Sequence, residues 1–457
     1  MKLLFCCESY WPHRGGVQEV MRQIAERMVA AGHDVTVATR AHPDRKENTH
    51  NGVGIENFDV SGNFVTGIRG EVDRYRKFLI AFDGDAILIK AAQQWSFDAL
   101  WPVLDEIRAR KVFVPCGFSS FYEPSFKDYF RQIPDILRKF NHLIFYAEHY
   151  RDIDFVRANG IANFSIIPNG ASEVEFGREP RQDGRLRQEL GIPATDLVFL
   201  TVGAPISAKG HEIVAEAFAQ VDTDGRGATL ILNGDWPVTR FEADRVRAVF
   251  QRFASLNSMQ KGIRLFREAG MRGVMDRLFP KPPQRVRVTG LTDTGSAKTD
   301  GRPTNADARA QKTVLRVDLP RSKVVDAFVE ADLFVFASRI EYSPLVLFES
   351  AAAGTAFLTV PAGNAAEIVR WTGGGWLCPA DVDERGYIKV SPTVLAREIE
   401  KGIRSPGYLR ELGAAGRRAW SDRFTWAKIA KSYERILRGE IAASPMQSNA
   451  AERAVGR

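Results

Sequence analysis

The chain has 457 residues, of which 44% are hydrophobic and 26% are charged, and its formal net charge is +7 at pH 7. The composition is that of a globular protein, and the length predicts two domains. The absence of an eighteen-residue apolar run excludes a membrane span, and the early charge at Glu8 argues against a secretory signal. Four cysteines without a CxxC pair predict reduced thiols in the cytoplasm, not a disulfide framework or a zinc site.

Strand and helix patterns alternate along the chain. This alternation predicts an α/β protein with parallel sheets that carry helices on both faces. A polar stretch with Pro and Gly at 178–187 is the predicted junction between two such units. The predicted strands are 3–6, 35–39, 86–90, 112–115, 143–146 and 165–168, and then 197–202, 229–232, 314–317, 333–337 and 357–360.

A turn that contains Gly15 and Gly16 follows the first strand and precedes an amphipathic helix. Glycines remove side chains where a backbone approaches a phosphate, although a tight turn can also need them for its dihedral angles. His13, in the same turn, is the histidine best placed to approach a ligand, and the alternative is an ordinary turn residue. The turn lacks the G-x-G-x-x-G pattern of a dinucleotide site.

A second glycine-containing turn runs from Gly203 to Gly210, after the apolar strand at 197–202. Lys209 lies next to the N-terminus of the following predicted helix, where a cation faces the positive end of the helix dipole. A bound diphosphate would remove this conflict. The alternative is an ordinary solvated lysine.

Residues from about 238 to 313 form a predicted insertion. Within it, residues 251–290 hold nine Lys or Arg against two Asp or Glu, interleaved with apolar residues. Two interpretations stay open: a solvated helical hairpin packed on its own domain, or a basic amphipathic element on an anionic membrane surface. No nucleic-acid-binding motif accompanies the charge, so nucleic acid is not an expected partner. Residues 441–457 are small and polar, which predicts a disordered tail.

Residues 339–354 give the most information about function. Ser343 is expected to cap a helix, Pro344 suits its first turn, and Gly354 suits its end. The free N–H groups at the start of such a helix make an anion site. The sequence therefore predicts an anion site at the end of a buried strand.

Two carboxylates flank this expected anion site. Glu341 lies on the loop before the helix, and Glu349, eight positions later, lies about a turn and a half inside it. Carboxylates do not bind an anion, but they accept hydrogen bonds from hydroxyls, so the pair is suited to a nucleotide-sugar. The alternative is a capped surface helix with two unrelated carboxylates.

This segment resembles the E-x7-E motif of the retaining GT-B glycosyltransferases, in particular the large family four (glycosyl transferases group 1). The resemblance extends over nearly all of residues 1–440 except the insertion. It implies two Rossmann-like, doubly wound domains that face a central cleft. These are an N-terminal acceptor-binding domain (1–175) and a C-terminal nucleotide-sugar donor domain (176–422), followed by a helix (423–440) that crosses back to the first domain.

The resemblance further implies a retaining, hexosyltransferase-like enzyme. Its donor would be a UDP-, GDP- or ADP-linked sugar, with no metal and no other cofactor. Its acceptor would be a glycan or lipid-linked molecule of cell-surface polysaccharide or glycolipid biosynthesis, in the cytoplasm or at the inner face of the membrane. Glu341 and Lys209 would be catalytic, and Glu349 would hold the ribose hydroxyls. The other expected donor-binding residues are Gly15, Gly16, Gly203, Tyr342, Ser343, Pro344 and Leu345.

Two positions depart from the family pattern. Ala204 replaces an Arg, and Cys116 replaces a His that lies near the reaction centre in relatives. We expect Cys116, with His13, to form a wall of the sugar site, since a free Cys is commonly a small buried apolar residue. The departures support an alternative function, a catalytically weak GT-B protein that acts as a binding or assembly partner. A nucleotide-sugar epimerase or dehydrogenase would need G-x-G-x-x-G and Tyr-x-x-x-Lys motifs, and neither is placed correctly.

Overall fold

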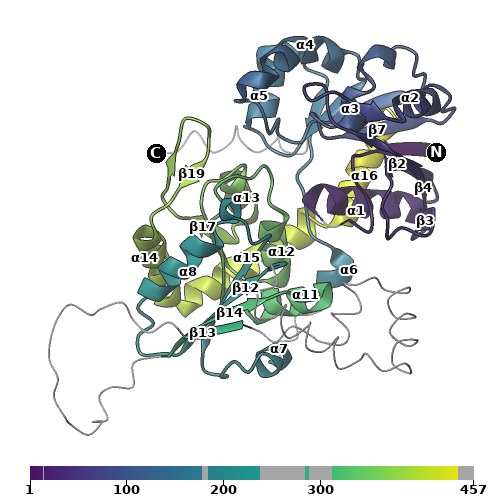
Figure 1. The fold of residues 1–457 in the computed structure, drawn as a ribbon. Coiled ribbons are helices and arrows are strands. Elements are labelled where there is room, and N and C mark those ends of the chain that lie inside the picture. The colour runs from purple at the N-terminus through teal and green to yellow at the C-terminus, as the bar shows by residue number, and fades with distance from the viewer. Residues whose placement is uncertain (14, 178–183, 237–283, 288–310, 441–457) are drawn as a thin grey trace, which may run out of the picture.

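Two sheets, each covered by helices, lie one above the other in the computed structural model (Figure 1). The structure describes residues 1–13, 15–177, 184–236, 284–287 and 311–440. The predicted basic insertion therefore lies almost entirely outside the described residues, and the predicted disordered tail lies wholly outside them. The interpretations of these two segments stay predictions.

The first sheet has eight strands in the order β10-β9-β8-β7-β1-β2-β4-β3. All neighbouring pairs are parallel except β3 and β4. The sequence did not predict β4, because its apolar residues are interrupted by Gly, Glu and Asn. The strands are β1 (Lys2–Cys6), β2 (Asp34–Arg40), β3 (Thr49–His50), β4 (Val53–Phe58), β7 (Ala86–Lys90), β8 (Arg110–Val114), β9 (His142–Phe145) and β10 (Phe164–Ile166).

Helices cover both faces of this sheet, and each face has its own buried apolar cluster. A parallel sheet needs this cover because its strands are apolar on both sides. The helical elements are α1 (Gly16–Ala30), α2 (Val72–Ile80), α3 (Trp95–Asp98), η1 (Trp101–Val103), η2 (Pro124–Phe126), α4 (Lys127–Arg138) and α5 (Arg151–Ala158). A small hairpin joins β5 (Val60–Ser61) to β6 (Arg69–Gly70).

The second sheet has seven strands in the order β13-β14-β12-β11-β15-β16-β17, and only the pairing of β13 with β14 is antiparallel. The strands are β11 (Leu197–Val202), β12 (Ala228–Asn233), β13 (Gln284–Arg287), β14 (Lys312–Val317), β15 (Leu333–Phe336), β16 (Phe357–Thr359) and β17 (Gly375–Leu377). The helices that accompany it are α6 (Glu173–Phe176), α7 (Arg185–Glu189), η3 (Ser207–Lys209), α8 (His211–Gln220), α11 (Arg321–Glu330), α12 (Leu345–Ala353), α13 (Ala365–Thr372), α14 (Pro392–Ile403) and α15 (Pro406–Arg423). A hairpin joins β18 (Asp381–Val382) to β19 (Ile388–Lys389).

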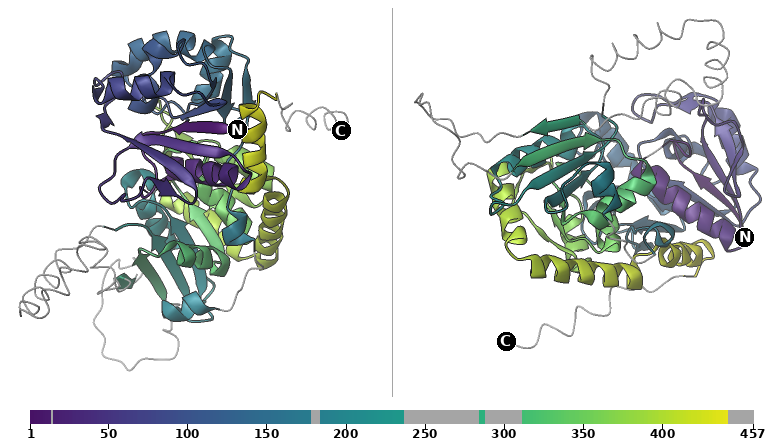
Figure 2. Two further views of the ribbon diagram at one scale, coloured as in Figure 1. Left: turned by 90° about the vertical axis from the view of Figure 1, so that its right-hand side faces the viewer. Right: turned by 90° about the horizontal axis from the view of Figure 1, so that it is seen from below.

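The last described helix, α16 (Trp426–Leu437), returns to the first sheet (Figure 2). Trp426, Ile429 and Tyr433 are buried in the same cluster as the inner face of α1. The preceding helix, α15, packs against α12 of the second unit. Helices α15 and α16 therefore contact both units and tie them together, although the exact domain boundaries expected above stay predictions.

Candidate functional site

Each sheet has a point where the strand order reverses. This point lies between β1 and β7 in the first sheet and between β11 and β15 in the second. Ligands of doubly wound folds bind at the carboxyl ends of the strands at such points, because the two flanking loops diverge there and leave a crevice. Lys209 and Glu341 lie on the loops at the switch point of the second sheet, whereas Glu349 lies inside α12 and Cys116 follows β8.

Lys209 and Glu341 come together at the switch point of the second sheet. The Lys209 ammonium donates a hydrogen bond to the Glu341 carboxylate, and both side chains are largely buried. The turn that carries Lys209 is held against the end of β15, where the carbonyl of Ala208 accepts from the Ser338 hydroxyl at 3.0 Å. A Cβ on Gly210 would lie 2.0 Å from the carbonyl oxygen of Ala337, so this close approach requires glycine.

Gly203 and Ala204 lie beside Lys209 at the end of β11. A Cβ on Gly203 would lie 3.7 Å from the Cβ of Lys209 and 3.5 Å from a ring nitrogen of His211. Burial lowers the pKa of His211 to about 4, so the imidazole is neutral at physiological pH. Ala204 is exposed. The position where the resembling family has an Arg is therefore open to solvent in this chain.

The helix after Glu341 begins one residue later than predicted. Pro344 is its N-cap residue in an extended conformation, and α12 starts at Leu345. The Ser343 hydroxyl is buried and has no hydrogen-bond partner among the described residues. The predicted Ser343 cap is therefore wrong, because Ser343 precedes the N-cap position and no side chain in the described part of the chain caps the first turn of α12. Gly354 ends the helix in the left-handed region, at φ 75°, as predicted.

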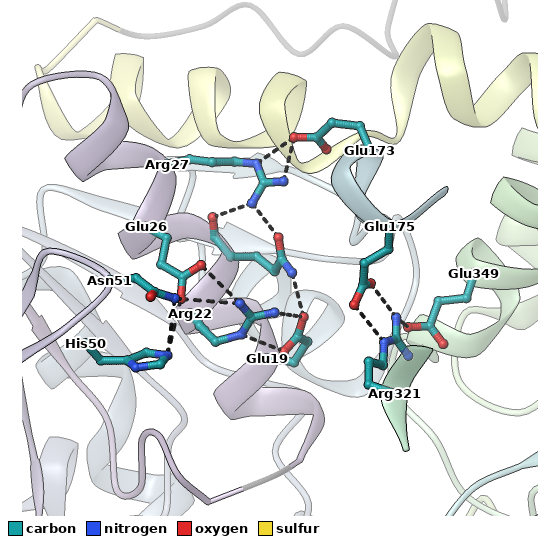
Figure 3. A network of polar contacts seen from close by, with 11 residues as sticks. Glu19, Arg22, Glu26, Arg27, His50, Asn51, Glu173, Glu175, Arg321 and Glu349 are labelled. Atoms are coloured by element: carbon teal, nitrogen blue, oxygen red, sulfur yellow. Dashed lines mark hydrogen bonds and ion pairs between the residues drawn. The ribbon is translucent and has the colours of Figure 1, made fainter. Parts of the chain in front are cut away.

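Glu349 lies inside α12 and pairs with Arg321 of α11. The guanidinium Nη2 of Arg321 donates to Oε1 of Glu349 at 2.6 Å. The same guanidinium donates two bonds to Glu175 of α6, at 2.9 and 2.7 Å (Figure 3). The sequence did not predict this pairing, because the three residues are far apart in the chain and share no motif.

Gly15 and Gly16 lie at the start of α1, on the side of the first unit that meets α12. Gly15 has an extended backbone with φ 175°, and neither glycine is in the left-handed region. The backbone conformation therefore does not demand glycine here. A Cβ on Gly16 would lie 4.0 Å from Cδ1 of Leu345, so the N-termini of α1 and α12 are close neighbours. His13 is exposed in the same turn.

The loops after β7 and β8 hold strained backbone conformations that the sequence did not reveal. Cys116 and Phe118 have φ values of 61° and 48°, with Gly117 between them at 87°. In the adjacent loop, Ala91 and Gln93 have φ values of 71° and 63°. Strained residues of this kind cluster at ligand sites, where the surrounding fold holds them in place. Burial raises the pKa of the Cys116 thiol, so it stays protonated and is poorly suited to act as a base.

Tyr342 joins the loop of Glu341 to the first unit. Its hydroxyl accepts a hydrogen bond from the backbone N–H of Tyr146 at 3.0 Å, and its ring stacks on Tyr150 with centroids 4.8 Å apart. The Tyr150 hydroxyl donates to the carbonyl oxygen of Glu341 at 2.7 Å. The first unit thus holds the backbone of Glu341 directly. Sequence reasoning assigned Tyr342 to the donor site and missed this contact.

A buried carboxylate, that of Asp152, holds the backbone next to the same interface. Asp152 accepts hydrogen bonds from the backbone N–H groups of Gly117 at 2.7 Å and Ile153 at 2.9 Å. Burial raises its pKa to about 6, while these bonds act in the opposite direction. The strained loop at Gly117 is therefore anchored by a fully buried side chain.

In the part of the chain that the structure describes, no group of three or more His, Cys, Asp or Glu side chains could hold a metal ion. Within the same residues, no helix combines the length and the apolar character that crossing a membrane requires.

Comparisons with known proteins point to one fold. Residues 247–389, which include Glu341 and Glu349, match the family model of glycosyl transferases group 1. No curated protein sequence matches the chain. The chain is similar to the structure of sucrose-phosphate synthase from Thermosynechococcus elongatus, with 18% identity, a TM-score of 0.65, and coverage of 97% of this chain and 100% of that one.

Two further solved structures give the same picture. HepE from Anabaena, in complex with UDP-glucose, has 18% identity and a TM-score of 0.63, with 96% of this chain and 100% of that chain covered. WaaG, a glycosyltransferase involved in lipopolysaccharide biosynthesis, has 15% identity and a TM-score of 0.58, with 96% and 100% covered. Likeness at this level of identity establishes the fold, and the predicted GT-B arrangement of two doubly wound α/β units is confirmed.

Proposed function

We propose that this chain, which has the GT-B fold and matches glycosyl transferases group 1 over residues 247–389, is a retaining glycosyltransferase. It moves a sugar from a nucleotide-sugar to the hydroxyl of a glycan or a lipid-linked acceptor. The second unit binds the donor, and the first unit binds the acceptor. Cell-surface polysaccharide or glycolipid biosynthesis is the setting that we propose for this reaction.

The ion pair of Lys209 and Glu341 is the observation that supports this proposal most. A cation and a carboxylate from two different loops meet where the strand order of the second sheet reverses. In the donor complex, Lys209 contacts the diphosphate and Glu341 contacts hydroxyls of the sugar. In the first unit, Gly15 and Gly16 at the start of α1 carry no side chains, so a phosphate oxygen can approach the backbone N–H groups there.

The chemical step needs no protein acid or base in this proposal. The acceptor oxygen forms a bond to the anomeric carbon while the bond from that carbon to the diphosphate oxygen breaks. The acceptor proton goes to the departing diphosphate on the same face of the sugar, which retains the anomeric configuration. Lys209 and the N–H groups at the starts of α1 and α12 stabilise the negative charge that develops on the diphosphate. A protonated Cys116 is compatible with this scheme.

A UDP-sugar is the first donor to test. The HepE structure contains UDP-glucose, and another similar structure, from E. coli with 12% identity and a TM-score of 0.56, is bound with UDP-2-fluoro glucose. GDP- and ADP-sugars are the other members of the panel. Association with the inner face of the membrane, through the basic insertion, is part of the proposal.

The test is a panel of UDP-, GDP- and ADP-sugars assayed for thermal stabilisation, since a ligand that binds only the folded state raises its melting temperature. The best donor is then incubated with glycan or membrane extracts, and release of the nucleoside diphosphate is measured. The anomeric configuration of the product is determined by NMR. Glu341→Gln is the control, and we expect it to bind the donor and to lose turnover.

Three results would count against the proposal. If no nucleotide-sugar stabilises the folded protein, the proposed function is wrong. If the donor binds but neither transfer nor hydrolysis occurs, and Glu341→Gln is indistinguishable from wild type, the chain is a binding or assembly partner. If the product has the inverted configuration, the retaining mechanism is wrong.

A further inference from the structure

Arg321 is the first residue of α11, and it lies between two carboxylates that come from different parts of the fold. It donates two parallel bonds to Glu175, from Nε at 2.9 Å and from Nη2 at 2.7 Å, and one from Nη2 to Glu349 at 2.6 Å. Figure 3 shows the guanidinium between the two acidic side chains. Its carbon also lies 5.9 Å from the ring centroid of Phe176.

This position is unfavourable for a cation unless it has a specific partner. A positive charge in the first turn of a helix faces the positive end of the helix dipole. Burial opposes the charge of Arg321 as well, but Glu349 and Glu175 outweigh burial and raise its pKa. The bidentate bond to Glu175 also orients the guanidinium plane, because two parallel N–H···O bonds permit one arrangement of the fork. Arg321 is therefore held by Glu175 in one orientation toward Glu349.

Glu349 is less exposed than either of its neighbours in this group. Its side chain is 10% exposed, against 42% for Arg321 and 23% for Glu175. Arg321 donates a hydrogen bond to Oε1 of this carboxylate, and Oε2 accepts no hydrogen bond from the described residues. One oxygen is thus fixed by the guanidinium, while the other has no hydrogen-bond partner among the described residues.

The helix that supplies Glu175 lies where the chain passes from the first sheet to the second. Two residues earlier, Oε1 of Glu173 accepts hydrogen bonds from Arg27 of α1, from Nε at 2.9 Å and from Nη2 at 2.5 Å. Its other oxygen accepts from the backbone N–H of Ala427, in the first turn of α16, at 3.4 Å. The short helix α6 therefore uses Glu173 to contact the first unit and Glu175 to contact the second.

We propose that Arg321 is a positioning residue that aligns Glu349 for the ribose hydroxyls of the donor, and that Glu175 transmits the placement of the junction helix α6 to this site through Arg321. The inference rests on the proposed function and on the ribose-binding role that the family resemblance implies for Glu349. It assigns a role in ribose recognition to Glu175, a residue that contacts Glu349 only through the guanidinium.

The test compares two ligands that differ only at the ribose. Dissociation constants are measured by calorimetry for the best nucleoside diphosphate of the panel and for its 2′,3′-dideoxy analogue, and their ratio is the ribose discrimination. For Glu175→Gln we expect the ratio to fall at least threefold while the affinity for the dideoxy analogue stays unchanged. Arg321→Met should lower the ratio further. The double variant should match Arg321→Met, because Glu175 acts through Arg321.

Lys323→Met is the matched control. Lys323 lies on the same helix, and its ion-pair partners among the described residues are Glu189 at 2.6 Å and Asp326 at 3.8 Å, not Glu349. We expect it to leave the ratio unchanged. If Glu175→Gln weakens both ligands equally, its role is structural and the inference is wrong. If it leaves both affinities at the wild-type values, the coupling through Arg321 is also wrong.

Failure of the proposed function looks different from failure of this inference. If wild-type protein binds no nucleotide, or binds both analogues equally, the donor site itself is wrong and the inference falls with it. If wild type discriminates and Glu349→Gln abolishes the discrimination, but Glu175→Gln and Arg321→Met do not change it, only the positioning role is overturned. Circular dichroism and thermal unfolding of each variant identify any that fail to fold, and Arg321→Lys then replaces Arg321→Met, with the same fall in the ratio expected because Lys lacks the bidentate fork.

Discussion

Lys209 and Glu341 are 132 residues apart in the sequence and form an ion pair at the carboxyl ends of β11 and β15. The pair neutralises two charges that both lie next to the start of a helix. In the proposed complex, the diphosphate replaces Glu341 as the partner of Lys209, and the sugar hydroxyls become the partners of Glu341. Donor binding therefore exchanges the bonds of two residues that the fold has already brought together.

Lys209→Ala should weaken binding of a nucleoside diphosphate and of the nucleotide-sugar, while the affinity for the free nucleoside stays almost unchanged. The lost interaction is with phosphate charge, so the advantage of wild type should shrink as the salt concentration rises. Calorimetry at low and high salt measures both effects. Equal weakening for nucleoside and nucleotide would instead indicate a general defect of the fold.

Glu349→Ala should weaken donor binding by about 1.5–3 kcal/mol, as expected for a hydrogen bond to a charged group. Arg321 keeps Glu175 as a partner in this variant, so the guanidinium is not left without a carboxylate. Calorimetry on folded protein gives the affinity. Wild-type affinity in Glu349→Ala would exclude the ribose assignment.

Cys116→Ser and Cys116→Ala should change turnover by less than about tenfold, or 1.4 kcal/mol. The reason is that the departing diphosphate, and not this side chain, takes the acceptor proton in the proposed mechanism. Steady-state rates with saturating donor check this expectation. A loss of several hundredfold, with donor affinity intact, would show that the thiol takes part in the reaction.

Gly117→Ala should destabilise the protein by about 1–3 kcal/mol, because its φ of 87° strains any residue with a side chain. The added Cβ would also lie 3.0 Å from the rings of both Tyr150 and Tyr342. Gly160→Ala is the matched control, since Gly160 has a φ of 68° and nothing within 4 Å of the new atom. Denaturant unfolding of both variants separates strain from the clash at the interface. Equal losses of stability in the two variants would mean that the clash with Tyr150 and Tyr342 costs nothing beyond the backbone strain.

The raised pKa of Asp98 should make the stability of the protein depend on pH. The side chain is buried, accepts bonds from the N–H of Phe64 and the hydroxyl of Tyr129, and burial raises its pKa to about 7. The folded protein therefore binds one more proton than the unfolded chain between roughly pH 4 and pH 7, where the unfolded carboxyl is already ionised. The contribution of Asp98 to stability is complete below about pH 4 and is lost as the pH rises through 7.

The measurement compares wild type with Asp98→Asn, which cannot titrate. The free energy of unfolding of wild type, relative to the variant, should fall by on the order of 3 kcal/mol between pH 4 and pH 8. Denaturant titrations at several pH values give this difference, and other titrating groups cancel in the comparison. A constant difference across this range would contradict the prediction.

The sequence by itself determined the class of fold. Apolar strands such as 86–90 and 333–337, with helical periodicity between them, are local patterns, and local patterns are sufficient to predict parallel sheets covered by helices. The helix end at Gly354 was also predictable, because a left-handed C-cap favours glycine strongly. The E-x7-E spacing located the two carboxylates on consecutive parts of a loop and a helix.

Only the tertiary structure decided what these residues contact. The position of the Ser343 hydroxyl depended on where Pro344 and Leu345 begin the helix, which is a difference of one residue that spacing does not settle. The insertion of Tyr342 between Tyr146 and Tyr150 depended on how the two units meet. Contacts of this kind join residues about two hundred positions apart.

The partners of Arg321 show the physical reason most clearly. Glu175 and Glu349 lie on two different helices, and no periodicity relates either of them to Arg321. Arg321 contacts both carboxylates because of the strand order of the second sheet and the course of the chain between the two sheets. Neither of these can be predicted from a local sequence pattern. A sequence specifies which side chains can pair, while strand order and the packing of helices select which of them do.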